Sequence, residues 1–196
     1  METAGAAGAA ALDYGGARYS RGAVTLHWII AALILVNLFL GFFHEEFARP
    51  TRAAMMGWHK SIGLAVLALT LVRLFWRFGH RPPAFDPVLK PWERGLARAV
   101  HALFYLLLFA IPVSGWLLVS TGTRVNPTSF FWLFNIGPLP VTPGEEIHDF
   151  AEEAHELLGY GMLLLVVLHV GGALKHHLDG HRHLIGRMAP WLYRRG

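Results

Sequence analysis

Four long apolar stretches limit how this chain folds. They span Thr25–Phe43, Ile62–Phe78, Ala99–Val119 and Leu157–Leu174, and each is close to the roughly 20 residues that a helix needs to cross a bilayer. Hydrophobic residues make up 54% of the chain and charged residues only 15%, whereas a soluble domain carries about 25% charged residues. The sequence therefore predicts an all-α membrane protein, a bundle of four transmembrane helices.

The distribution of positive charge predicts the orientation of this bundle. If the four helices alternate in direction, all but four of the 17 Lys and Arg residues fall on one side. Lys and Arg accumulate in cytoplasmic loops, so we expect both termini in the cytoplasm. The basic side suits anionic lipid headgroups, and no basic patch with interleaved aromatic residues indicates a nucleic-acid partner. The four exceptions are Arg49, Arg52, Lys60 and Arg124.

Composition predicts one folded domain between two short tails. We expect a disordered tail rich in Ala and Gly at residues 1–17, the four-helix domain at 18–190, and a basic tail at 191–196. The chain has no cysteine, which excludes disulfides, iron–sulfur clusters and thioether-linked haem. Any metal cofactor must therefore be held by other ligands.

Capping and turn residues predict where the helices begin and bend. Ser20 is a suitable N-cap for the first helix. The second helix should begin around Ala53–Met56, after an outer turn that contains Pro50. Pro112 predicts a kink in the third helix. The segment Thr121–Pro143 is the longest loop, and its aromatic residues should lie among the lipid headgroups.

Four histidines inside or beside the apolar stretches are the candidate functional residues. His155 and His169 are 14 residues apart, which places them about 21 Å apart along one helix and on nearly the same face. By alternation of the helices, His59 and His155 lie at the outer level, and His27 and His169 lie at the inner level. An ionisable residue within a membrane span is by default a candidate for function.

These two pairs at matched depth predict two bis-histidine haems b. Ligation by two imidazoles fills both axial positions of the iron, which suits electron transfer. His101 is the competitor, because it lies near the inner end of the third helix and is an alternative partner of His169. A single buried histidine is as often an interhelical hydrogen-bonding residue or a proton relay. Zinc is disfavoured, because it requires three or four ligands at one level.

The pattern resembles the bacterial cytochrome b561 family, and within it the four-helix members that act as superoxide:ubiquinone oxidoreductases. The resemblance covers nearly all of residues 18–191 and is specific because of the histidine spacing. The matching residues are Arg18-Tyr19-Ser20, Leu26-His27-Trp28, His59, Gly63, Arg73, Arg77, His101, Tyr105-Leu106, Pro112, Asn126-Pro127, His155-Glu156, Gly159-Tyr160, Leu168-His169, His176-His177, Met188 and Pro190.

The resemblance implies a location in a bacterial inner membrane, two haems b with the same histidine pairing, and a ubiquinone site at the inner face. His176 matches the family's quinone-contacting histidine. Arg73 lies 14 residues after His59, hence at the level of the inner haem, and we expect it to bind a haem propionate through its guanidinium. Lys60 is adjacent to His59 and, with Arg124, is expected to attract superoxide.

The sequence as a whole predicts a di-haem membrane oxidoreductase that passes electrons from periplasmic superoxide to cytoplasmic ubiquinone. One departure is that the outer segments carry more acidic than basic residues, which opposes the approach of an anion. The alternatives are a cytochrome b subunit that exchanges electrons with a partner such as a basic periplasmic redox protein, and a haem-free transporter or assembly factor. The acidic residues are Glu45, Glu46, Glu145, Glu146, Asp149, Glu152, Glu153 and Glu156.

Overall fold

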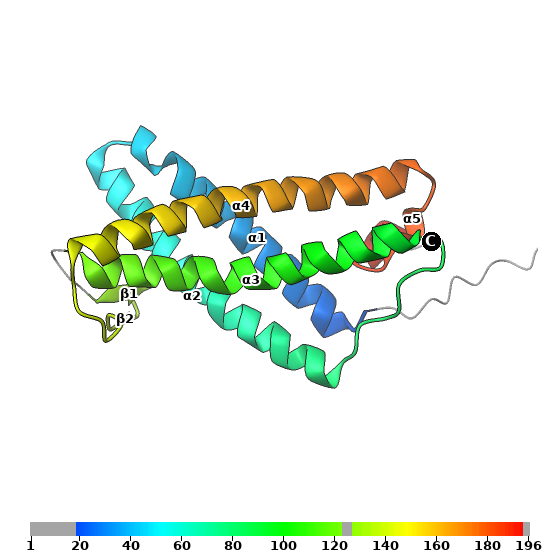
Figure 1. Cartoon of the computed structure of the whole chain (residues 1–196), viewed down its shortest axis with the longest axis horizontal. Helices are drawn as coiled ribbons and strands as arrows, with labels where there is room; N and C mark the ends of the chain where they lie inside the picture. Colours follow the sequence, from blue (N-terminus) through cyan, green and yellow to red (C-terminus); the bar gives the residue numbers. More distant parts are fainter. Residues whose placement is uncertain (1–18, 123–126, 194–196) are drawn as a thin grey trace, which may run out of the picture.

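The computed structural model describes residues 19–122 and 127–193, and these form the expected helical bundle (Figure 1). Its four long helices are each long and apolar enough to cross a membrane, which confirms the predicted fold class. The expected N-terminal tail at 1–17, Arg18, Arg124 and residues 194–196 lie outside the described residues. The helices are α1 (Arg21–Phe43), α2 (Arg49–Gly79), α3 (Pro91–Thr121) and α4 (Glu145–Leu178).

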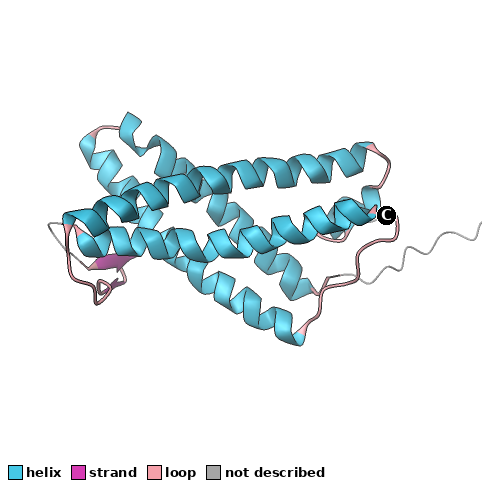
Figure 2. Ribbon diagram, viewed as in Figure 1, coloured by secondary structure: helices cyan, strands magenta, loops and turns pink. Residues whose placement is uncertain are grey.

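The long helices form two hairpins that cross each other. α1 packs along α2, and α3 packs along α4, while the first hairpin runs obliquely across the second (Figure 1). We call the end that holds residues 19–20 and the connection 80–90 the inner end, and the opposite end the outer end. Figure 2 shows that the only strands drawn lie at the outer end, beside the start of α4 and the end of α3.

The apolar core lies between the two histidine levels. All four long helices contribute to it. The buried core residues lie one or two helical turns from the histidines, on the side toward the middle of the bundle. It excludes water from the middle of the bundle and holds the hairpins together. The fully packed members are Ile30, Ile62, Val66, Leu107, Leu108, Met162 and Leu165.

α1 begins after Ser20, as predicted from the sequence, whereas α2 begins earlier than predicted. The hydroxyl of Ser20 accepts a hydrogen bond from the amide of Ala23 (3.3 Å) and caps α1. We expected α2 to begin around Ala53–Met56, but it begins at Arg49. Pro50 occupies the first turn of the helix, where its missing N–H has no partner to lose. α3 continues through Pro112 without interruption.

The outer loop is more ordered than the sequence predicts. Within it, β1 (Thr128–Phe130) and β2 (Phe134–Ile136) form an antiparallel hairpin. Its turn holds Phe131 and Trp132 at positive φ, 48° and 59°, a conformation that side chains other than Gly adopt uncommonly. No glycine marks the turn, so the usual sequence signal of a hairpin is missing.

Ser61 of α2 holds this hairpin in place. Its side chain is fully buried, and its hydroxyl accepts from the amide of Phe131 (3.0 Å). The one hydroxyl hydrogen is shared between the carbonyls of Gly57 (2.9 Å) and Ser129 (3.1 Å). The ring of Trp132 lies against Gly57, where an added Cβ would come within 3.1 Å of it. The hairpin therefore packs on the turn of α2 that carries His59.

The chain after α4 folds back beneath the inner end instead of leaving as a simple tail. It contains α5 (Arg182–Gly186) and a 3₁₀ turn, η2 (Pro190–Tyr193). We call residues 181–193 the C-terminal segment. Its Arg187 donates to the carbonyl of Ala84 (2.7 Å), and His183 lies 3.1 Å from the carboxylate of Asp86. These contacts attach it to the connection between α2 and α3.

Candidate functional site

The outer histidine pair meets as the sequence predicts. His59 of α2 and His155 of α4 face each other with ring centroids 6.0 Å apart and ring planes at 84°. An imidazole nitrogen binds a first-row metal at about 2.0–2.1 Å. Two imidazoles on opposite sides of one metal ion therefore have centroids roughly 6 Å apart. The spacing of this pair fits a single iron with two axial histidines.

Backbone carbonyls fix the tautomer of both outer histidines. Nδ1 of His59 lies 3.0 Å from the carbonyl oxygen of Asn37, and Nδ1 of His155 lies 3.0 Å from that of Ile111. The hydroxyl of Ser114 also lies 3.1 Å from Nδ1 of His155, and because it donates its own hydrogen to the carbonyl of Ile111 (2.9 Å) it accepts from the imidazole. A carbonyl only accepts, so each Nδ1 carries a hydrogen and donates it. In the neutral ring this leaves the lone pair on Nε2, the arrangement that histidine ligands of metals usually adopt.

A glycine four residues beyond each carbonyl makes this contact possible. Gly41 follows Asn37 on α1, and Gly115 follows Ile111 on α3. An added Cβ would come within 2.9 Å of the His59 ring at Gly41 and 2.8 Å of the His155 ring at Gly115. Side chains lean toward the N-terminus of a helix, so a side chain at the fourth following position would cover the carbonyl. α1 and α3 thus support the two ligands in the same way.

A cavity of about 660 Å³ surrounds the outer pair. This volume is within the range of 300–1,000 Å³ that small-molecule and cofactor pockets occupy. The cavity also reaches Gly159 of α4, which leaves room beside the backbone. Donor set, tautomer, glycine contacts and volume all fit a haem held by His59 and His155.

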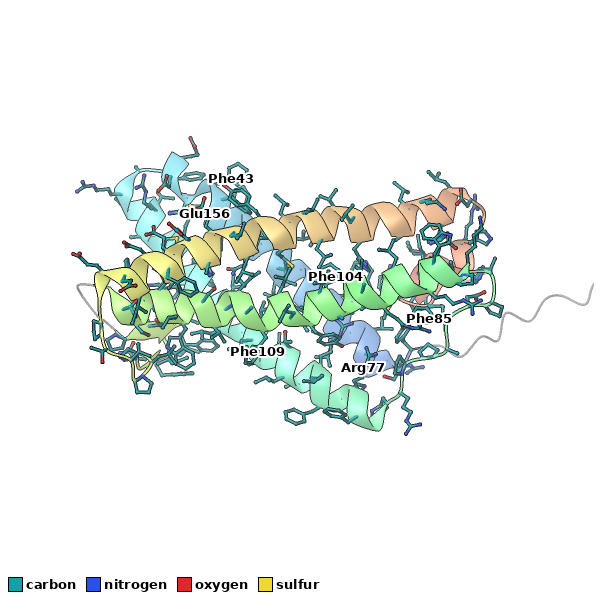
Figure 3. The ribbon with its side chains drawn as sticks, in the orientation of Figure 1. Phe43, Arg77, Phe85, Phe104, Phe109 and Glu156 are labelled. Atoms are coloured by element: carbon teal, nitrogen blue, oxygen red, sulfur yellow. The ribbon has the colours of Figure 1, made fainter. Side chains whose placement is uncertain are left out.

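The mouth of this cavity is acidic. Exposed Glu45, Glu152 and Glu156 line it, and among the residues that the structure describes the half-buried Lys60 is the one Lys or Arg in its wall. Figure 3 shows Glu156 toward the outer end of the bundle, and Arg77 toward the inner end. Within residues 19–122 and 127–193, a small anion that approaches His59 therefore meets three carboxylates and one ammonium group in the cavity wall.

The inner level brings three histidines together. The ring centroid of His169 on α4 lies 6.3 Å from that of His27 on α1 and 5.8 Å from that of His101 on α3. Phe104 packs edge-on against the same ring at 5.3 Å. Both distances suit a shared metal, so geometry keeps His27 and His101 as candidate partners of His169. Only the pairing with His27 joins the two hairpins.

Arg73 lies at this inner level, as its spacing from His59 predicts. Its guanidinium nitrogen is 3.2 Å from Nδ1 of His27 and its carbon lies 6.0 Å from the ring centroid of Tyr105. Arginine only donates, so this contact places the hydrogen of a neutral His27 on Nε2. A metal at Nε2 would need the lone pair there, so the hydrogen of the neutral ring would lie on Nδ1 instead. Nδ1 could then no longer accept from Arg73, and the guanidinium would have to turn to another acceptor. The carboxylate expected there, a haem propionate, is such an acceptor.

His176 lies on the last turn of α4, in the position that the sequence places it. Its ring centroid is 6.4 Å from that of His181 in the C-terminal segment. Next to it, Lys175 donates to the carboxylate of Asp179 (2.7 Å), and this hydrogen bond lowers the pKa of Asp179. The region is polar and solvated, as a site for protonation chemistry requires.

Sequence reasoning missed the residues that support the outer ligands. Asn37, Gly41, Ile111 and Gly115 carry no signal by themselves, because their role depends on which helix faces are in contact. The sequence signal that could have found them is a glycine predicted to lie at the same depth as a buried histidine on a neighbouring helix. Within the described residues, no three His, Asp or Glu side chains converge on one metal position.

Comparison with known proteins identifies what this arrangement resembles. The sequence model of the family described as prokaryotic cytochrome b561 matches residues 18–191. Cytochrome b561 homolog 2 of Escherichia coli K12 is 32% identical over 178 residues, which are 87% of this chain and 90% of that protein. The probable superoxide oxidase CybB of Yersinia pestis is 25% identical over 176 residues, 88% of this chain and 96% of that protein.

The glycine contacts yield a direct prediction. Gly41→Ala and Gly115→Ala should displace the neighbouring imidazole and break its bond to the carbonyl. We expect each change to weaken retention of a haem at the outer pair about tenfold, a typical effect of losing a partner of a metal ligand. The measurement is the rate of haem transfer from purified protein to apomyoglobin. Gly95→Ala is the matched control, because a Cβ there meets nothing within 4 Å. Wild-type transfer rates in both variants would contradict the assignment.

Proposed function

Because the chain belongs to the prokaryotic cytochrome b561 family, we propose that it is a di-haem oxidoreductase that carries electrons from superoxide to ubiquinone across the membrane. The family binds haem b and transfers electrons within membranes. The observation that carries the proposal is the pair of histidine levels, with the outer ligands already fixed by Asn37 and Ile111. This assignment replaces the alternative of a haem-free transporter or assembly factor.

In the proposed site, His59 and His155 hold the outer haem, and His27 and His169 hold the inner one. Bound there, two haems b supply one-electron transfer between the two ends of the bundle. The protein contributes fixed ligand positions and a dry core between the two levels. Arg73 turns from His27 to a propionate, which neutralises a carboxylate inside the membrane.

At the outer end, Lys60 attracts superoxide toward His59. Two superoxide anions give up two electrons and leave as two molecules of O₂. One ubiquinone takes up these two electrons and two protons to become ubiquinol. His176 at the inner end donates a hydrogen bond to a quinone carbonyl and passes it a proton. The basic inner end faces the cytoplasm of a bacterial cell, so this proton is cytoplasmic.

The acidic mouth of the outer cavity favours a second candidate function. Glu45, Glu152 and Glu156 form a surface that attracts a basic protein. In this case the chain is a cytochrome b subunit that exchanges electrons with a periplasmic redox protein instead of superoxide. The ligands and the quinone end are the same in both proposals. The two differ only in the electron donor.

Alanine substitution tests the ligand set. His59→Ala or His155→Ala should remove the outer haem and leave the inner one, and His27→Ala or His169→Ala should do the reverse. The haem-to-protein ratio should fall from about two to about one in each variant, because one imidazole cannot fill both axial positions. The pyridine haemochrome assay and a redox titration measure this ratio and identify the remaining haem.

The same measurement decides between the two inner pairings. If His101→Ala loses a haem while His27→Ala keeps both, then His101 of α3, and not His27 of α1, is the partner of His169. Arg73→Leu is included as a further arm. Unchanged occupancy and potential of the inner haem in that variant would exclude the propionate contact.

The quinone end is tested with His176. His176→Ala should retain both haem spectra but slow reoxidation of the reduced protein by ubiquinone about 100-fold, within the usual range for the loss of a proton donor. Stopped-flow absorbance gives the rate. His177→Ala, the neighbour on the same turn, is the matched control. Equal rates in the two variants would remove His176 from the quinone site.

Salt dependence and charge reversal at Lys60 identify the donor. If Lys60 attracts superoxide, Lys60→Glu should slow haem reduction about fivefold, since reversing one charge at about 8 Å in water costs about 1 kcal/mol. Added salt should also slow the wild type. For a basic protein donor, added salt should also weaken association, so the two donors are separated by Lys60→Glu, which should then be neutral or helpful. Superoxide-driven reduction no faster than the uncatalysed background, at any salt concentration, would leave the partner protein as the donor.

A further inference from the structure

The C-terminal segment makes a specific contact with α1 at the inner site. The indole nitrogen of Trp28 donates to the carbonyl oxygen of Met188 at 2.7 Å, and the ring of Trp28 packs edge-on against Trp191, with centroids 5.4 Å apart. These residues are separated by about 160 positions in the chain. Ala189 between them is fully buried, so the segment is packed here and is not a loose tail.

Trp28 is the residue next to His27. Its ring centroid lies 5.4 Å from that of His27, with the two planes at 71°. Consecutive side chains of a helix are about 100° apart around the axis. The bond to Met188 therefore holds α1 from a direction different from that of His169, and it fixes the rotation of α1 at this level.

The rotation of α1 matters because His169 has two possible partners. His27 is 6.3 Å away and His101 is 5.8 Å away. A side-chain tip lies about 5–6 Å from the helix axis, so a rotation of about 20° moves the His27 ring by roughly 2 Å. That displacement equals the length of a metal–nitrogen bond. A small rotation is thus enough to exclude His27 and leave His101 as the remaining partner.

We propose that Trp28 is a positioning residue, which the C-terminal segment holds through Met188 and Trp191 so that His27 and not His101 pairs with His169. The segment follows directly from α4, so it ties the end of α4 to α1, which belongs to the other hairpin. α3 and α4 are joined without it. This proposal rests on the proposed function, since it concerns the ligands of the inner haem.

The test compares two tryptophans that make the same kind of bond. Trp28→Phe keeps a ring but loses the donor to Met188. Trp116→Phe loses the equivalent bond at the outer end, where the indole donates to the carbonyl of Gly137 at 3.1 Å. Haem transfer to apomyoglobin and low-spin electron paramagnetic resonance are recorded for each variant. The resonance depends on the angle between the two imidazole planes, so it reports ligand orientation directly.

We expect Trp28→Phe to speed loss of the inner haem about tenfold and to shift only the inner resonance. Trp28→Ala should give a larger effect, and Trp116→Phe should leave the inner haem unchanged. Trp191→Leu serves as a second variant, because its ring is half exposed and its loss should not prevent folding. It should change the inner haem in the same direction.

Wild-type inner signals in Trp28→Phe and Trp191→Leu would overturn the proposal. Equal acceleration of both haems would also overturn it, because it would show that the segment only stabilises the whole fold. A wild-type protein with a single haem is a different result, which contradicts the proposed function itself. The pyridine haemochrome ratio of the wild type separates that case from the others.

Discussion

The hydrogen bond from a buried imidazole to a backbone carbonyl is the interaction on which the outer site depends. A histidine within a membrane span needs a partner for each ring nitrogen, because no water replaces a missing one. The carbonyls of Asn37 and Ile111 satisfy Nδ1 of His59 and His155 and leave the lone pair of each neutral ring on Nε2. Carbonyls inside a helix are normally covered, and Gly41 and Gly115 uncover these two. The cavity around the outer pair is therefore shaped as much by α1 and α3 as by the helices that carry the two proposed ligands.

The inner site is organised differently. Its histidines have a charged neighbour, Arg73, in place of carbonyl partners. Two candidate rings lie at similar distances from His169, whereas the outer pair has no such competition within the described residues. Contacts from the C-terminal segment and from Arg73 surround this level, and both come from residues outside the histidine pattern. The outer site is thus fixed mainly by helix packing, and the inner site depends on additional restraints.

The helices and the depth of each histidine were predictable because they follow from simple periodicities. The length of the apolar stretches predicts the four helices. The 14-residue spacing of His155 and His169 predicts that the histidines lie at two depths in the bundle. Lateral position was not predictable: spacing along a helix does not say whether His27 or His101 is nearer to His169. The hairpin at residues 128–136 was missed because Phe131 and Trp132 adopt a turn that usually takes glycine. The ligand roles themselves remain predictions.

Each histidine pair that we assign takes one ring from the α1–α2 hairpin and one from the α3–α4 hairpin. A helical hairpin is a unit that enters a bilayer on its own, and two such units associate there afterwards without a strong hydrophobic force between them. An iron that binds both rings supplies an attraction that lipid does not, because metal binding energy becomes folding energy when the ligands come from separate parts of a chain. If the assigned pairs bind haem, we expect haem binding to complete assembly, so that the supply of haem would set how much of the newly inserted chain becomes a closed bundle.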